Sequence, residues 1–240
     1  MIEPLLLTTP RLCTFAGDRL LSAASSFFFE REGRLYLVTS RHVLYDQASA
    51  HLPDRVELTV HVDPDRMALT ANVSLPLYQA GRAVWRQACD TGGEVDVAAL
   101  PLDAGVLPPG AVIERFAPES VAGALEQVEV GTPVLVPAYP LGFFDTVHHL
   151  PVVRAGCVAS SFGVRFQGQG FFLTDVRTHR GSSGAPVVQR HAGTVQQLPW
   201  RLLGVHSSRM DMLDRDAVAD ESLGLNCAWY ADVLLALTDG

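Results

Sequence analysis

Short apolar segments separated by turn residues run through most of the chain. Residues 35–38 (LYLV) and 95–102 (VDVAALPL) are almost continuous apolar runs, and residues 56–62 alternate apolar and polar positions. Apolar runs of this length are typical of buried strands, and alternation is typical of strands with one buried face. Long amphipathic helical repeats are absent from most of the chain. The pattern therefore predicts an all-β protein.

The end of the chain departs from this pattern. Within residues 229–237, Tyr230, Val233, Leu234 and Leu237 recur at helical spacing among helix-forming residues. One apolar face repeated every three to four residues indicates an amphipathic helix. We therefore predict a short C-terminal helix.

Length and composition agree with many short strands. The chain has 240 residues, 48% of them hydrophobic, with 20 glycines and 15 prolines that can supply the turns between strands. A chain of this length is long enough to bury a substantial core.

A glycine-flanked serine is the most informative local motif. Residues 181–186 read GSSGAP and lead into an apolar strand. Glycines allow a sharp turn that exposes a serine and points backbone N–H groups at one spot, as an oxyanion-binding site requires. The alternative is an ordinary hairpin turn, because the same residues are common in turns.

A serine nucleophile needs a base, and the base needs a carboxylate to orient it. His42 follows the apolar strand at residues 35–38, and Asp96 is embedded in the apolar strand at 95–102. A lone histidine after a strand is more often structural than catalytic. A carboxylate buried without a partner is costly, however, so Asp96 requires one, and His42 is a candidate.

These motifs together resemble the trypsin/chymotrypsin-like serine peptidases, particularly their HtrA-like and glutamyl-endopeptidase branches. The resemblance covers most of the chain. The segments that carry it are SFFF at 26–29, TSRHV at 39–43, DVAAL at 96–100, YPLG at 139–142, GSSGAP at 181–186, LGVHS at 203–207 and LGLN at 223–226, the last as the final barrel strand.

The resemblance implies a chymotrypsin-like fold of two six-stranded antiparallel β-barrels and a short C-terminal helix. We expect an N-terminal barrel at residues 1–105 that carries the base and its carboxylate. A Pro/Gly-containing stretch begins the crossing linker, expected at 106–124. The C-terminal barrel, with the nucleophile and the helix, would cover 125–240 and start near Leu125.

The resemblance also implies catalytic roles. Ser183 would be the nucleophile, His42 the general base and then acid, and Asp96 the orienting carboxylate. The backbone N–H groups of Gly181 and Ser183 would form the oxyanion hole, and Ser207 would help to hold Asp96. Ser182 stands where the chymotrypsin branch has the Asp that pairs with a newly cut N-terminus, which argues against activation by propeptide cleavage.

Specificity for the residue before the cut can be argued from three positions. Thr178 lies five residues before Ser183, and His206 lies on the expected substrate-lining strand, as in the relatives that select Glu or Gln. Both side chains can hydrogen-bond a carboxylate or a carboxamide. Arg177 falls where trypsin-like enzymes carry an Asp, and its cation would disfavour Lys and Arg substrates. Alternatively, His206 fills the barrel interior and Arg177 points to solvent.

Charge and cysteine usage limit the expected partners and the expected cellular compartment. The net charge is −8 and no basic stripe is present, so nucleic acid is not an expected partner. We find no convincing signal peptide, no membrane-length apolar run and no motif that calls for a cofactor or metal. The four cysteines are widely separated and read as buried thiols rather than bridges, although two pairs stay open. These features favour a bacterial cytoplasm.

Two classes of function follow. The first is a serine endopeptidase that acts on a protein or peptide substrate through an acyl-enzyme and selects Glu or Gln before the cut. The second is a peptidase-like protein that is activated by a protein partner, or a catalytically idle binding module. The complete set of His42, Asp96 and Ser183 favours the first, because an idle fold has no chemical need for all three.

Overall fold

The computed structural model describes residues 2–122, 128–191, 198–210 and 223–239. The N-terminal half contains α1 (Pro4–Leu7), β1 (Arg11–Ala16), β2 (Arg19–Ser25), β3 (Phe27–Arg31), β4 (Arg34–Thr39), α2 (Arg41–Leu44), β5 (Arg55–His61), β6 (Thr70–Pro76), β7 (Tyr78–Gln79), β8 (Arg82–Ala83), β9 (Arg86–Asp90) and β10 (Gly93–Leu102). The C-terminal half contains η1 (Pro118–Ser120), β11 (Pro133–Ala138), η2 (Pro140–Gly142), β12 (Val152–Cys157), β13 (Phe171–Thr174), β14 (Pro186–Arg190), β15 (Trp200–Arg209), β16 (Asn226–Tyr230) and α3 (Val233–Leu237). The predicted all-β fold with a short C-terminal helix is confirmed.

The N-terminal half is built from two antiparallel sheets. Their strand orders are β2-β1-β5-β6 and β3-β4-β10-β9, and β7 and β8 form a separate hairpin. This half therefore differs in detail from the expected six strands. The pairing of β10 with β4 sets Ala98 opposite Thr39, which brings the start of β10 to the end of β4. This register decides where His42 and Asp96 lie.

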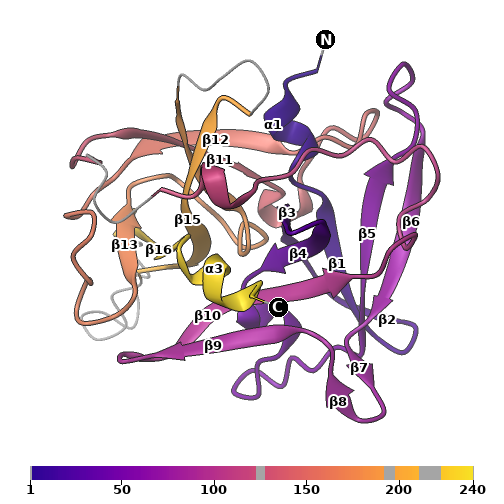
Figure 1. Ribbon diagram of the computed structural model, residues 1–240, viewed down its shortest axis with the longest axis horizontal. Helices are drawn as coiled ribbons and strands as arrows, with labels where there is room; N and C mark the ends of the chain where they lie inside the picture. Colours follow the sequence, from indigo (N-terminus) through magenta and orange to yellow (C-terminus); the bar gives the residue numbers. More distant parts are fainter. Residues whose placement is uncertain (1, 123–127, 192–197, 211–222, 240) are drawn as a thin grey trace, which may run out of the picture.

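The C-terminal half is one sheet of six strands in the order β12-β11-β14-β15-β16-β13. A bridge between Val158 and Thr174 links the chain just after β12 to the end of β13. The Ala159 N–H also donates to the Leu173 carbonyl at 2.8 Å. These contacts join the two outer strands, so the sheet curls toward closure (Figure 1).

The segment between the halves contacts both of them. Val112 and Phe116 bridge to His61 and Phe29 of the N-terminal half, whereas Val121 bridges to Leu202 of the C-terminal half. The expected start of the C-terminal barrel near Leu125 lies outside the described residues.

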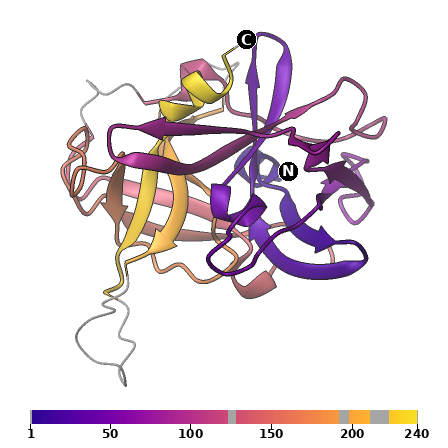
Figure 2. The same cartoon turned by 90° about the horizontal axis from the view of Figure 1, so that it is seen from below.

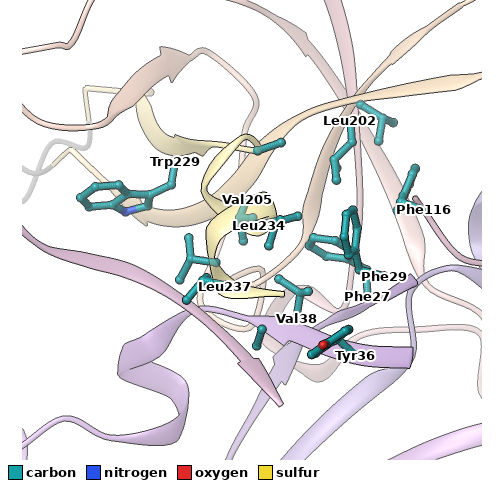
Figure 3. Packing of buried hydrophobic residues seen from close by; sticks show 14 of the residues in the cluster. Phe27, Phe29, Tyr36, Val38, Phe116, Leu202, Val205, Trp229, Leu234 and Leu237 are labelled. Carbon is teal, nitrogen blue, oxygen red and sulfur yellow. The ribbon is translucent and has the colours of Figure 1, made fainter. Parts of the chain in front are cut away.

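Within the described ranges, three apolar clusters form the interior. One lies within each half, and the third joins them with side chains from both (Figure 3). Phe27, Phe29 and Tyr36 enter this joining cluster from the N-terminal half, and Leu202 and Trp229 enter it from the C-terminal half. Each fully buried large side chain contributes about 1.5–3 kcal/mol, so this cluster fixes the halves against each other.

Helix α3 completes the joining cluster. Leu234 and Leu237 are buried there, and the helix lies against β9 and β10 of the N-terminal half (Figure 2). The observed helix is shorter than the predicted one, because Tyr230 belongs to β16 and not to the helix. The predicted last strand was also misplaced. It forms at Asn226–Tyr230, and residues 223–225 precede it.

None of the helices among the described residues has the length and apolar character needed to cross a membrane.

Candidate active site

His42 and Asp96 meet where β4 passes into the single turn of α2. The Nδ1 atom of His42 lies 2.7 Å from Oδ2 of Asp96, and the His42 backbone N–H donates to Oδ1 at 2.9 Å. Both carboxylate oxygens therefore orient one residue. A carboxylate beside Nδ1 favours the tautomer with the proton on that atom, which leaves Nε2 free as an acceptor.

Ser207 supplies a third bond to the same carboxylate. Its hydroxyl on β15 donates to Oδ2 of Asp96 at 2.5 Å. Burial alone would raise the pKa of Asp96, but the hydrogen bonds from His42 and Ser207, with the His42 charge, hold it below its ordinary value. Asp96 therefore stays an anion at neutral pH.

Ser183 lies on the turn that leads into β14. Together with His42, Arg180 and Gly181, it lines a cavity of about 390 Å³ between the two halves. The Ser183 hydroxyl donates to the carbonyl of Ser207 at 3.0 Å, and the described residues show no hydrogen bond between it and His42. Ser183 and His42 thus share one cavity, and the described residues show no bond between them.

Two backbone N–H groups beside Ser183 are available for an oxyanion. Neither Gly181 N–H nor Ser183 N–H finds an acceptor within the described part of the chain. The Arg180 carbonyl accepts the Leu141 N–H at 2.6 Å. Because C=O and N–H point in opposite directions across a trans peptide, this bond turns the Gly181 N–H away from Leu141. Two such donors can hold a developing negative charge.

The close approach of the backbone explains both glycines of this turn. Gly181 has φ +91°, and a Cβ there would lie 2.5 Å from the Tyr139 carbonyl oxygen. Gly184 has φ +85°, and its Cβ would overlap the Thr39 hydroxyl. Only glycine combines this backbone conformation with this proximity.

The three predicted specificity residues differ in exposure. Thr178 is buried and donates to Oδ1 of Asn226 at 2.5 Å, while Arg177 is exposed. His206 is 2% exposed, and its Nδ1 has no partner among the described residues. Burial, followed by the His42 charge, lowers the pKa of His206 to about 4. None of the three lines the cavity at Ser183.

Two polar residues near the site were missed in the sequence. Asn226 accepts from Thr178 and donates from Nδ2 to the Val176 carbonyl at 2.5 Å. Ser25, at the end of β2, is fully buried, and its hydroxyl donates to the Gly181 carbonyl in the turn at residues 181–184. A hydroxyl at a strand end is common, so only the fold distinguishes Ser25.

The described residues contain no group of three or more His, Cys, Asp or Glu side chains placed to hold a metal ion, and all four cysteines are free thiols. Contrary to the expectation of buried thiols, Cys89 is exposed, whereas Cys227 is buried.

The chain is similar to known peptidases. Residues 24–195 match the family described as trypsin-like peptidase domain. The crystal structure of the serine endoprotease from Yersinia pestis superposes with a TM-score of 0.55 at 15% sequence identity, over 96% of this chain and 61% of that one. This chain thus spans about three fifths of the length of that protein. No curated protein sequence matches it significantly.

Proposed function

Because this chain belongs to the family of trypsin-like peptidase domains, we propose that it is a serine endopeptidase that cleaves proteins through an acyl-enzyme on Ser183. One observation carries this proposal. Asp96 holds His42 through both carboxylate oxygens, and His42 lines a cavity together with Ser183 and Gly181, whose N–H has no acceptor among the described residues.

In the proposed reaction, the Ser183 oxygen attacks the peptide carbonyl carbon while its proton passes to Nε2 of His42. The N–H groups of Gly181 and Ser183 hold the carbonyl oxygen as it becomes an anion. His42 then gives the proton to the leaving amine, and a new amino terminus departs. Water then attacks the acyl-enzyme by the same steps, with His42 again as base and then acid, which releases the carboxylic acid and restores Ser183.

Asp96 stays ionised through these steps. It keeps the imidazole in one tautomer and stabilises the imidazolium that forms. The Ser207 carbonyl, on β15, can accept a hydrogen bond from an extended substrate that pairs as an added strand. Such a strand would compete with Ser183 for the Ser207 carbonyl, which accepts the Ser183 hydroxyl at 3.0 Å without substrate.

The test is the intact mass after incubation with a fluorophosphonate, compared with Ser183→Ala. A single adduct on the native protein that is absent from the variant is the expected result. A well-folded native protein that forms no adduct would contradict an active resting peptidase.

A finer proposal concerns the residue before the cut, which we propose is Glu or Gln. His206 is neutral near pH 7, because its pKa is about 4, so one ring nitrogen can donate and the other accept. Its buried Nδ1 finds no partner in the described part of the chain, and the Thr178 hydroxyl, which donates to Asn226, is the second polar group of the proposed pair. A neutral imidazole can recognise a carboxamide as well as a carboxylate.

A peptide library read by mass spectrometry tests this specificity. We expect cleavage after Glu and Gln, and a loss of that preference in Thr178→Val, which replaces the hydroxyl with a methyl group. A profile dominated by Lys, Arg or large apolar residues before the cut would overturn the assignment.

One observation favours the alternative of a latent enzyme that a protein partner activates. The Ser183 hydroxyl is bonded to Ser207 and not to His42. Under this alternative, the partner would turn Ser183 toward the base. The isolated protein would then react slowly with the fluorophosphonate, and adding cell lysate would speed the reaction. Full reactivity without lysate would exclude it.

A further inference from the structure

Ser25 connects the N-terminal half to the nucleophile turn, residues 181–184, by two hydrogen bonds, and to Tyr139 by a third. Its hydroxyl donates to the Gly181 carbonyl at 2.8 Å and accepts the Tyr139 N–H at 3.0 Å. Its own N–H donates to the Ser183 carbonyl at 3.0 Å. The residue is 0% exposed, so water cannot replace these partners.

The bond from Ser25 completes the fixing of Gly181. Two peptide planes flank this residue, and each has its carbonyl bonded. The Arg180 carbonyl accepts the Leu141 N–H, and the Gly181 carbonyl accepts the Ser25 hydroxyl. A glycine has almost no steric preference of its own, so these two bonds replace the restraint that a side chain would supply. They hold the Gly181 N–H in the direction in which it can meet an oxyanion.

Ser25 also contacts the strand that leads to the base. The Thr39 hydroxyl donates to the Ser25 carbonyl at 2.8 Å, and Thr39 ends β4 three residues before His42. One buried residue therefore joins β4, the turn at residues 181–184 and the turn at Tyr139. Ser25 does not line the cavity at Ser183, and its contacts with the nucleophile turn are both to carbonyl oxygens, those of Gly181 and Ser183.

We propose that Ser25 is a positioning residue that keeps the Gly181 N–H in its oxyanion-binding orientation. The proposal rests on the proposed function of Ser183 and extends it to a residue that does not touch substrate. Without the hydroxyl, the Gly181 carbonyl and the Tyr139 N–H lose their partner in the protein interior, where an unpaired polar group is costly. The peptide on either side of Gly181 then rotates, and the donor leaves its place.

The kinetic test compares Ser25→Ala with Ser26→Ala. Ser26 is the matched control, because it is also 0% exposed and its hydroxyl donates to a backbone carbonyl, that of Pro10, at 3.0 Å. Deleting an oxyanion donor costs about 10²–10³ in turnover, so we expect a displaced donor to lower kcat roughly 10- to 100-fold in Ser25→Ala. KM should change little, and Ser26→Ala should stay within about twofold of the native protein.

The pH profile separates positioning from general damage. Ser25→Ala should lower the plateau of kcat/KM and leave its midpoint unchanged, because the contacts between His42 and Asp96 are intact. A shifted midpoint, or an equal loss in both variants, would overturn the proposal.

Hydrogen–deuterium exchange gives a readout that does not depend on activity. The peptide that spans residues 178–186 should exchange faster in Ser25→Ala than in the native protein or in Ser26→Ala. If the native protein were inert toward substrate, the catalytic role of Ser183 would fail, and the exchange rates would still decide whether Ser25 orders the turn. Unchanged exchange in Ser25→Ala would overturn the proposal in either case.

Ser25→Cys keeps the test decisive if the alanine variant folds poorly. A thiol is a weaker donor than a hydroxyl but fills the site. Its turnover and its exchange rate should lie between those of the native protein and Ser25→Ala. A cysteine variant with native turnover and native exchange would count against a role for the hydroxyl bond.

Discussion

Asp96 concentrates the polar contacts of the site on one carboxylate. It accepts hydrogen bonds from the His42 ring, the His42 backbone and the Ser207 hydroxyl. Bonds to an ionised acceptor contribute about 1.5–3 kcal/mol each, which offsets the cost of burying the charge. The same contacts leave the imidazole one orientation, so the chemistry of His42 depends on Asp96.

We predict that Asp96→Asn lowers kcat/KM on the order of 10⁴-fold. The amide can present an N–H to Nδ1 of His42, and this favours the tautomer with its proton on Nε2, which cannot accept the proton of Ser183. Steady-state hydrolysis measures the effect. Glu94→Gln is the control, since Glu94 lies on the same strand and pairs at 3.1 Å with Arg41 at the surface. Near-native turnover in Asp96→Asn would show that another group orients the base.

His206 makes stability depend on pH. Its pKa falls from 6.5 to about 4 in the folded protein, mainly because it is buried. The unfolded chain therefore binds a proton below pH 6.5 that the folded protein does not bind until about pH 4. Between these values the free energy of unfolding should decrease as the pH falls, by about 1.4 kcal/mol per pH unit at most from this group.

Urea unfolding at several pH values, on the native protein and on His206→Gln, measures this contribution. The variant should lose less stability between pH 6.5 and 4.5, because its amide does not titrate. Equal slopes in the two proteins would contradict a neutral, buried His206.

The predictability of a residue from the sequence depends on how unusual its local setting is. Asp96 could be found because a carboxylate inside an apolar strand is costly unless it is paired. Ser25 could not be found, because a serine at a strand end is ordinary. Its partners are also distant, Tyr139 by 114 residues and Gly181 by 156. Only the pairing of strands across the molecule brings them together.

The turn at residues 181–184 is shaped by a second turn, η2. Leu141 of η2 donates to the Arg180 carbonyl, and Leu141 itself has φ +54°, a left-handed conformation that is uncommon outside glycine. Two turns far apart in the chain therefore determine each other's backbone. A side chain added between them would separate both.

We predict that Gly181→Ala lowers kcat/KM by at least about 100-fold, because the added methyl group meets the Tyr139 carbonyl and displaces the oxyanion donor. Gly33→Ala is the matched control. Gly33 also has positive φ, at +76°, but nothing lies within 4 Å of its Cβ position. Both variants should lose stability from backbone strain, and only Gly181→Ala should lose activity. Similar activities in the two would show that contact with Tyr139 is unimportant.

The error in the C-terminal helix shows where periodicity misleads. Tyr230, Val233, Leu234 and Leu237 have helical spacing, yet Tyr230 is the last residue of β16. This strand pairs with β13 and β15 on its two sides, and the backbone bonds to both neighbours decide its conformation. A strand followed directly by a helix on the same core produces a continuous apolar pattern, so the boundary could not be read from it.

A shared apolar core joins the two halves. The cluster that contains Phe27, Phe116 and Leu202 has side chains on both sides, and α3 covers it. Its burial holds together the two halves that carry His42 and Ser183.

We predict that Leu234→Ala lowers the free energy of unfolding by about 2–5 kcal/mol, because it leaves a cavity in the shared core. Leu235→Ala, on the exposed side of the same helix, should change it by less than about 0.5 kcal/mol. Leu234 is 0% exposed and Leu235 is 37% exposed. Guanidinium unfolding measures both, and equal effects would contradict the role of α3 in the core.

The anchoring of the nucleophile turn by Ser25 has a consequence for the synthesis of the protein on the ribosome. Residues 25, 42 and 96 are synthesised first, yet Gly181 and Ser183 must still emerge before either peptide plane at Gly181 can be held. Under the proposed mechanism, a growing chain carries His42 and Asp96 long before it carries Ser183 and the Gly181 N–H. Cleavage would begin only when these late-made residues dock onto early-made ones, so the unfinished polypeptide would have no peptidase activity.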